Sequence, residues 1–282
     1  MTGPLDHLQQ FVGNSETSED VITASQVGRL AVTLDVPHPS PNKGDAVPPG
    51  YQGVFFPILA PLGSLRADGQ TQGGGVTPTV PLARRRLVDV RGTFHDALRV
   101  GDDVSKVTEV AKIHVEDYGA GPTACVTVRE SISTPRGLAI VDERDVLFFG
   151  EDGPGEATQP MKLPETSSWQ RTYESNPVMI FRLSACRFNS HRIHYDRDYT
   201  VGEEGYPGLV VPFTLVAFQM MEMCRLEIPD RRLASFRYVS EKPVYDLGPY
   251  TMFGERDGEN VTLWATDYED EVAVTATATL KS

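Results

Sequence analysis

Apolar and polar residues alternate along two stretches of the chain, residues 88–149 and 234–280. Gly, Pro and Asp break each stretch into segments of strand length, such as PTACVTVRESIS in the first and ENVTLWATDYED in the second. A period of two is typical of strands with one buried face, and turn residues at this spacing favour antiparallel neighbours. We therefore expect two blocks of antiparallel strands.

An apolar segment of helical length precedes each block. Residues 207–227, PGLVVPFTLVAFQMMEMCRLE, are hydrophobic on nearly every side of a helix, and residues 50–63, GYQGVFFPILAPLG, form the corresponding piece of the first half. Such a helix has to be enclosed on several sides, which a curved sheet wrapped around it achieves. The repeated order predicts an α+β double hotdog, in which two curved antiparallel sheets each wrap a central apolar helix. Residues 17–34 are expected to add one or two short helices.

A proline- and glycine-rich interval, GEDGPGEATQPMKLPETSS, separates the two blocks of strands. Its apolar content is too low for it to pack against a core, which is typical of a linker. We expect an N-terminal hotdog domain at 1–150, a linker at 151–168 and a C-terminal hotdog domain at 169–282.

Composition narrows the classes of partner and compartment. Lys and Arg number 26 against 39 Asp and Glu, and a formal charge of −13 disfavours nucleic acid. Three widely spaced cysteines predict no disulfide framework, and a reducing compartment fits them best. The N-terminus shows no targeting pattern, and the apolar stretch at 209–223 is too short to span a bilayer. We expect a cytoplasmic protein with no membrane partner.

The densest cluster of titratable groups lies at residues 181–211, FRLSACRFNSHRIHYDRDYTVGEEGYPGLVV. His191 and His194 are three residues apart and share a face of any helical turn, with Asn189 nearby. An HxxH pair is found in metal sites, but no third ligand has a clear spacing here. We expect no metal and assign the cluster to acid–base chemistry.

Within this cluster, FNSHRIHYDRDY followed by EGYPGLVV resembles the hydroxyacyl-thioester dehydratase type 2 group of the MaoC-like hotdog superfamily, which includes mesaconyl- and 3-methylfumaryl-CoA hydratases. The segments VPLARRRL, FHDALRVGDDV and GLAIVDERDVLFF look like the degenerate N-terminal dehydratase domain of these proteins. The resemblance therefore extends over nearly the whole chain. It implies a hydro-lyase that acts on an enoyl or 3-hydroxyacyl thioester.

The resemblance also implies roles for individual residues. In the wider superfamily an aspartate precedes the histidine by five residues, and this chain has Asn189 and His194 at those positions. An amide orients water but transfers no proton, so His194 is expected to be the acid–base residue. His191 is the third catalytic candidate. The substrate-binding candidates are Arg192, Tyr206, Gly208, Phe213, Arg84 and Arg85.

Two of these assignments leave alternatives open. Arg84 and Arg85 either bind the phosphates of coenzyme A or the acidic helix of an acyl carrier protein, or they are solvated charges on a strand edge. Arg192 either binds a second carboxylate of a dicarboxylic acyl group or pairs with Asp196 or Asp198. No cofactor is expected beyond the coenzyme A or phosphopantetheine that the substrate itself carries.

The chain departs from the family pattern after PGLVV. A His-Gly-Pro continuation, whose glycine lets the backbone approach the thioester oxygen, is replaced by Pro212, Phe213 and Thr214. Proline supplies no N–H and phenylalanine adds bulk, although the Phe213 N–H can still donate. The departure keeps two alternatives open: an isomerase, dehydratase or cyclase of specialised biosynthesis, and a non-catalytic acyl-binding partner subunit. A homodimer is a further open alternative.

Overall fold

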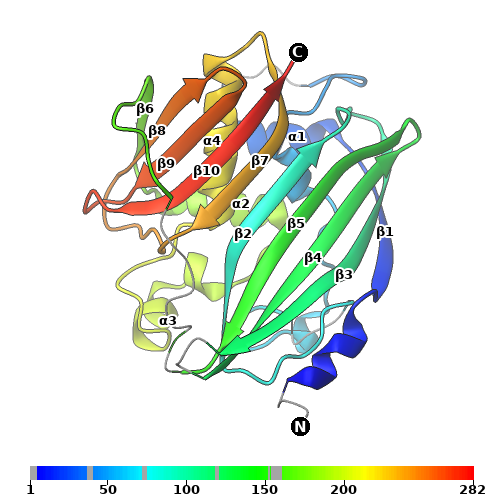
Figure 1. Cartoon of the computed structure of the whole chain (residues 1–282), viewed down its shortest axis with the longest axis vertical. Coiled ribbons are helices and arrows are strands. Elements are labelled where there is room, and N and C mark those ends of the chain that lie inside the picture. The colour runs from blue at the N-terminus through cyan, green and yellow to red at the C-terminus, as the bar shows by residue number, and fades with distance from the viewer. Residues whose placement is uncertain (1–4, 37–40, 72–74, 118–120, 152, 154–160) are drawn as a thin grey trace.

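Ten strands form one antiparallel sheet in the computed structural model, which describes residues 5–36, 41–71, 75–117, 121–151, 153 and 161–282. The strand order is β1-β3-β4-β5-β2-β7-β10-β9-β8-β6, so the first five strands form one half and the last five the other (Figure 1). The N-terminal strands are β1 Ser15–Val21, β2 Arg84–Phe94, β3 Asp103–Asp117, β4 Pro122–Thr134 and β5 Gly137–Phe149. The C-terminal strands are β6 Trp169–Tyr173, β7 Arg232–Ser240, β8 Tyr250–Asp257, β9 Asn260–Thr266 and β10 Val272–Lys281.

The two halves join where β2 pairs with β7, in a register that runs from Asp89 opposite Val239 to Thr93 opposite Ser235. The Arg237 guanidinium reaches across this junction and donates to Asp89 at 2.8 Å. The expected alternating strands are therefore confirmed, but the two sheets are continuous and not separate. Residues 152 and 154–160 of the expected linker lie outside the described residues.

The helices are α1 Ala24–Thr33, α2 Pro177–Arg187, α3 Arg197–Gly202 and α4 Phe213–Glu227. Helices α1, α2 and α4 lie on one face of the sheet, behind the strands in Figure 1, and α3 lies at the lower left of that view. Shorter 3-10 turns occupy Asp6–Phe11, Tyr51–Val54, Leu62–Ser64 and Arg192–His194. Among the described residues no helix is both long enough and apolar enough to cross a membrane.

The C-terminal half contains the expected central helix, α4. Its residues from Leu215 to Cys224 are all buried, which explains why the sequence is apolar on every side. The helix ends at Glu227, just before Ile228 and Pro229, because the residue that precedes a proline is disfavoured in helical conformation.

The N-terminal half lacks the central helix that was predicted at residues 50–63. This segment contains only two short 3-10 turns, Tyr51–Val54 and the start of Leu62–Ser64, and residues 57–61 between them have no regular structure. Pro57 and Pro61 remove backbone donors from this stretch, and Gly50 has a left-handed φ of 93°, so a continuous helix cannot form. Residues 17–34 were also partly misassigned, because Ser15–Val21 pair with β3 as a strand and only Ala24–Thr33 are helical.

Candidate active site at the start of the central helix

The His194 side chain is buried beside the start of α4, with a relative exposure of 8%. It lies in the 3-10 turn Arg192–His194, which follows a chain reversal at Phe188, whose φ is 53°. Its Nδ1 is 2.7 Å from the carbonyl oxygen of Val210, two residues before Pro212. A carbonyl only accepts, so Nδ1 carries the proton and Nε2 keeps a free lone pair.

Burial lowers the pKa of His194 to about 4, and the positive charge of Arg187 lowers it further, whereas the bond to Val210 opposes the shift. An imidazole ordinarily titrates near about 6.5. His194 is therefore neutral at neutral pH. A neutral imidazole with one fixed proton and one free nitrogen is able to accept a proton.

His191 lies against His194, with ring centroids 5.5 Å apart and planes at 86°. Burial, followed by the neighbouring His194, lowers the pKa of His191 to about 4. The amide nitrogen of Gln70 is 2.9 Å and 3.0 Å from its two ring nitrogens. In the described chain the group of three side chains with metal-ligand spacing is Asp267, Glu269 and Glu271, which does not include the histidines.

A loop of the N-terminal half, residues 66–70, holds this histidine segment in place. Asp68 O accepts from the N–H of Arg192 at 2.9 Å, and the Ser190 hydroxyl donates to Gly69 O at 2.6 Å. Gly69 has a φ of 82°, and a Cβ there would lie only 1.9 Å from Ser190 O. Sequence reasoning missed these residues; the Asp-Gly pair signals a turn, but nothing in the pattern tells what the turn contacts.

The two polar candidates beside the histidines are both engaged locally. Asn189 accepts the backbone N–H of His191 through Oδ1 at 3.2 Å, which leaves its amide N–H groups for another partner. Arg192 donates to Asp196 at 2.8 Å and 2.9 Å, and its guanidinium lies 3.8 Å from the ring centroid of Tyr199. The structure thus shows the ion-pair alternative for Arg192.

Helix α4 begins directly after Pro212 and has no side-chain cap. Leu215 N–H bonds to Pro212 O at 2.8 Å, whereas the N–H groups of Phe213 and Thr214 belong to the first turn, where a helix provides no acceptor. The Phe213 ring packs against Tyr238 with centroids 4.7 Å apart. Unpaired N–H groups at a helix start carry partial positive charge and suit an oxyanion.

Tyr206 and Gly208 shape the loop between α3 and α4. Gly208 is buried, and a Cβ there would lie 2.8 Å from Oδ1 of Asp246, which accepts the N–H of Leu209 at 2.8 Å. The Tyr206 ring lies 6.0 Å from that of Tyr245, and burial raises the pKa of its hydroxyl. Gly208 thus sets the close packing that positions the chain leading to Val210.

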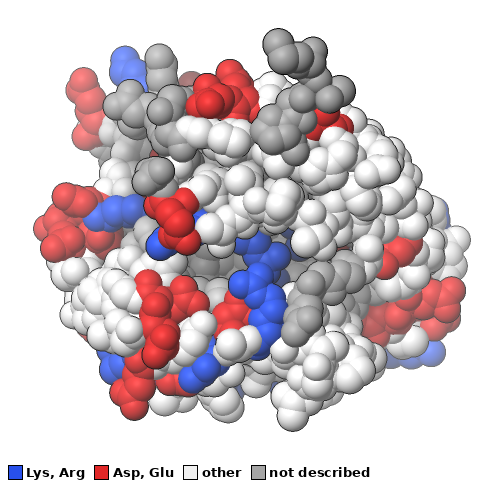
Figure 2. Space-filling model, turned by 90° about the horizontal axis from the view of Figure 1, so that it is seen from below, with Lys and Arg blue, Asp and Glu red and all other residues white. Residues whose placement is uncertain are grey.

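Arginines lie at the start of β2, at the lower end of the molecule in Figure 1. Arg84 pairs with Glu151 at 2.9 Å and is exposed. Arg85 is near Arg66 and Asp68, and burial followed by Arg66 lowers its pKa, although its side chain still reaches the surface. Figure 2 shows a hollow on this lower face with Lys and Arg side chains along one side.

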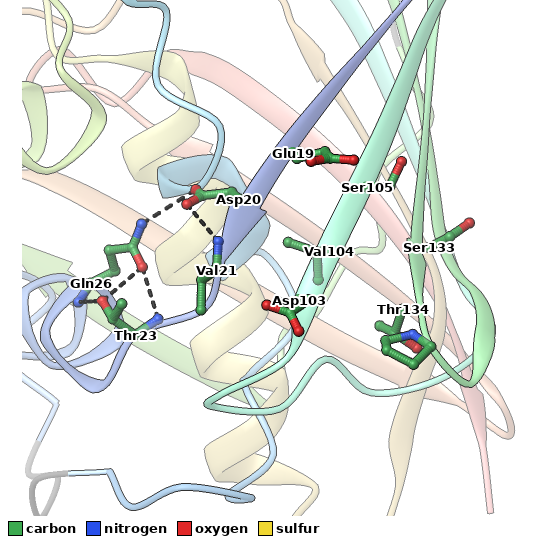
Figure 3. Close-up of a pocket in the computed structure, with 11 residues that line it drawn as sticks. Glu19, Asp20, Val21, Thr23, Gln26, Asp103, Val104, Ser105, Ser133 and Thr134 are labelled. Carbon is green, nitrogen blue, oxygen red and sulfur yellow. Dashed lines mark hydrogen bonds between the residues drawn. The ribbon is translucent and has the colours of Figure 1, made fainter.

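A separate hollow of about 630 Å³ lies where β1 ends and β3 begins (Figure 3). Its polar groups bond to one another: Asp20 accepts from Val21 N–H at 2.7 Å, and Gln26 accepts from Thr23 N–H at 2.9 Å. None of its lining residues comes from the histidine segment. This hollow therefore does not belong to the candidate active site.

A family model described as hydroxyacyl-thioester dehydratase type 2 matches residues 50–246, which include both histidines and the 66–70 loop. The chain belongs to the hydroxyacyl-thioester dehydratase type 2 family. This member is 35% identical over 271 residues to a mesaconyl-C(4)-CoA hydratase of Chloroflexus aurantiacus, with 96% of each chain covered.

Solved structures agree on the fold of this family member. A MaoC-like dehydratase from Phytophthora capsici superposes with a TM-score of 0.72 at 12% identity, covering 99% of both chains. A conserved hypothetical protein of Mycobacterium tuberculosis with a double hotdog fold superposes at 0.53 and 13% identity, covering 96% of both chains. These structures confirm the predicted double hotdog. The match to the family model and the C. aurantiacus relative confirm the resemblance and the class of hydro-lyase.

Proposed function

We propose that the chain adds water reversibly to the carbon–carbon double bond of a 2-enoyl-CoA, with His194 as the acid–base residue. The observation that supports this most is the state of the imidazole: it is buried and neutral, and Val210 fixes its tautomer so that Nε2 is the basic atom. The bond from Nδ1 to Val210 O, two residues before Pro212, also supports the proposal, because it ties His194 to the chain that leads into α4.

In the hydration direction, Nε2 of His194 takes one proton of a water molecule held by the Asn189 amide. The water oxygen forms a bond to the β-carbon, and the electron pair of the double bond moves onto the thioester oxygen as an enolate. The imidazolium then returns the proton to the α-carbon, which restores the thioester and the neutral base. Dehydration is the same sequence in reverse.

The negative charge of the enolate needs donors that are fixed before the reaction. The N–H groups of Phe213 and Thr214, at the start of a 15-residue helix, supply them without reorganisation. We further propose that Arg66, Arg84 and Arg85 contact the phosphates of coenzyme A at the lower face, because arginine forks match phosphate oxygens. The C. aurantiacus relative, named for a CoA thioester, supports CoA over a carrier protein.

His194→Ala tests the assignment. The ultraviolet absorbance of the conjugated thioester, followed with a panel of enoyl-CoA substrates, should show kcat/KM reduced by roughly 10²- to 10⁴-fold. His114→Ala is the matched control, because His114 is exposed and pairs with Glu116 on β3. Unchanged turnover by His194→Ala would remove His194 from the mechanism.

A second candidate, an isomerase or cyclase on the same fold, is supported by Phe213, whose ring fills space beside Tyr238 at the helix start. The double variant Pro212→His with Phe213→Gly tests it by restoring the family residues. If the wild type hydrates no enoyl-CoA and the double variant does, the departure has changed the reaction. If neither is a hydratase, the departure at 212 and 213 is not what removes hydratase activity.

A further inference from the structure

Arg187, the last residue of α2, is a cation without an anion. Its Nε donates to the carbonyl oxygen of Gly53 at 3.1 Å, and Nη1 donates to the hydroxyl of Thr214 at 2.5 Å. Among the described residues it has no carboxylate within ion-pair distance, although the charge of Glu130 still acts on it, and Nη2 donates to none of them. A guanidinium has five N–H donors, so most of one edge remains free.

Arg187 lines a cavity of about 210 Å³, whose walls also include residues of the segment 50–63 that was expected to form the N-terminal helix. The walls of the cavity include Gly53, Phe56, Arg187, Thr214, Phe218 and Tyr238. A cavity of this size has room for an acyl group of a few carbons.

Arg187 connects the cavity to the proposed base, although His194 itself does not line the cavity. Arg187 is bonded to Thr214 in the first turn of α4, and its charge acts on His194, whose pKa it lowers. An acyl group whose thioester oxygen meets the N–H of Phe213 or Thr214 therefore extends towards Arg187.

The other charges in the cavity largely cancel. Glu130 is 3.0 Å from Lys106 and also pairs with Arg144. Asp142 accepts from Gln52 at 3.1 Å. Burial raises the pKa of Asp142 to about 6, so this carboxyl ionises less readily than an exposed one. Of the three cations that line the cavity, Lys106 and Arg144 share Glu130, whereas Arg187 has no carboxylate within ion-pair distance among the described residues, and a desolvated unpaired charge is costly until it is paired.

We propose that Arg187 binds a free carboxylate on the acyl group, so that the site selects short enoyl thioesters with a second acidic group. The assignment rests on the proposed hydration at His194. Two parallel N–H···O bonds from a guanidinium edge to a carboxylate give both affinity and orientation. Arg192, the sequence-based candidate for this role, has its donors directed to Asp196 and Ala67 O.

The first test uses the wild-type chain and three probes: mesaconyl-C4-CoA, the same thioester with its free carboxylate as a methyl ester, and crotonyl-CoA. Mesaconyl-C4-CoA carries its carboxylate on the carbon that receives water. We expect its kcat/KM to exceed that of the methyl ester roughly 10- to 100-fold, the range of a charge-assisted hydrogen bond. Equal values would overturn the assignment while leaving the proposed hydration intact.

The second test uses Arg187→Met, which keeps the length of the side chain and removes its charge. We expect kcat/KM for mesaconyl-C4-CoA to fall roughly 10- to 100-fold, with the methyl ester affected less than about 3-fold. Arg182→Met, an exposed arginine on the same helix, is the matched control. An equal loss of kcat/KM for both substrates would mean that Arg187 only links Gly53 to Thr214 structurally and does not bind the carboxylate.

Two further outcomes separate the proposals. If Arg187→Met does not fold, the ratio of kcat/KM for mesaconyl-C4-CoA to that for its methyl ester, measured on the wild type, still decides the question. Arg187→Lys keeps the charge without the planar guanidinium and should retain part of that ratio. If the wild type hydrates none of the three probes, including crotonyl-CoA, the proposed hydration itself fails. If it hydrates crotonyl-CoA as well as the dicarboxylic probe, only the carboxylate site fails.

Discussion

The pKa of His194 is set by its surroundings more than by its own chemistry. Burial and the charge of Arg187 bring it to about 4, so the neutral base is the dominant form over the whole physiological range. Protonation on acidification removes the base. We expect kcat/KM for hydration to stay level down to about pH 5 and to fall below about pH 4, measured with folding checked by circular dichroism.

Asp142 supplies the control for this pH profile, because burial raises its pKa to about 6. If kcat/KM falls near pH 6 in the wild type but not in Asp142→Asn, the fall reports the titration of Asp142 and not that of His194. A fall near 6.5 that persists in Asp142→Asn would show that His194 has an ordinary pKa, which contradicts the burial argument.

Single residues were predictable where the motif was local. His194, His191 and Asn189 lie within six residues, and the structure brings the two rings together. Gln70 contacts His191 across 121 positions of sequence, and no periodicity or spacing connects such positions. Arg187 was overlooked for a related reason: its importance comes from the absence of a partner, which depends on the fold.

At the level of elements, the 66–70 loop is the part of the N-terminal half that directly supports the histidine segment. Gly69→Ala would place a methyl group 1.9 Å from Ser190 O at a φ of 82°. We expect this change to cost about 1–3 kcal/mol of unfolding free energy and to lower kcat at the same time, because Ser190 and His191 must shift. Urea unfolding and turnover measure the two effects.

Gly63→Ala is the matched control, since a Cβ at Gly63 meets no atom within 4 Å and its φ is not left-handed. It should change neither quantity. If Gly69→Ala keeps full activity despite lower stability, the loop supports the fold alone and does not position the histidines.

Elements were predictable where one physical cause dominates. Period-two alternation predicted the long strands, since one face of each packs on the core. The sequence did not predict a strand at Ser15–Val21, because most of its side chains are exposed and show no apolar alternation. Pairing with β3 is what makes this segment a strand. The helix expected at 50–63 was wrong because apolar content was weighed above Pro57, Pro61 and the glycines.

For the molecule as a whole, the continuous sheet and a shared core link the two halves. One hydrophobic cluster includes Leu30 and Phe94 from the N-terminal half together with Leu215 and Phe236 from the C-terminal half. Two independent domains would each have their own core. The order of elements predicted the double hotdog. It did not predict that β2 and β7 pair to form one sheet, because the sequence of each half alone does not indicate which strand edge pairs with the other half.

The shared core predicts a single cooperative unfolding transition. Both tryptophans, Trp169 and Trp264, lie in the C-terminal half, so their fluorescence reports that half, whereas circular dichroism reports the whole sheet. In urea the two signals should give the same midpoint, which is the test of two-state behaviour. Two separate midpoints would show that the halves unfold independently.

Phe94→Ala strengthens this test, because it removes a buried ring, 7% exposed, from the N-terminal strand β2. A buried Phe→Ala change costs about 3–5 kcal/mol, and in one cooperative unit that loss must also shift the tryptophan transition of the other half. Val107→Ala, at a position on β3 that is 40% exposed, should shift neither signal appreciably. A Phe94→Ala variant that moves the dichroism but not the fluorescence would mean that the β2–β7 junction transmits no stability between the halves.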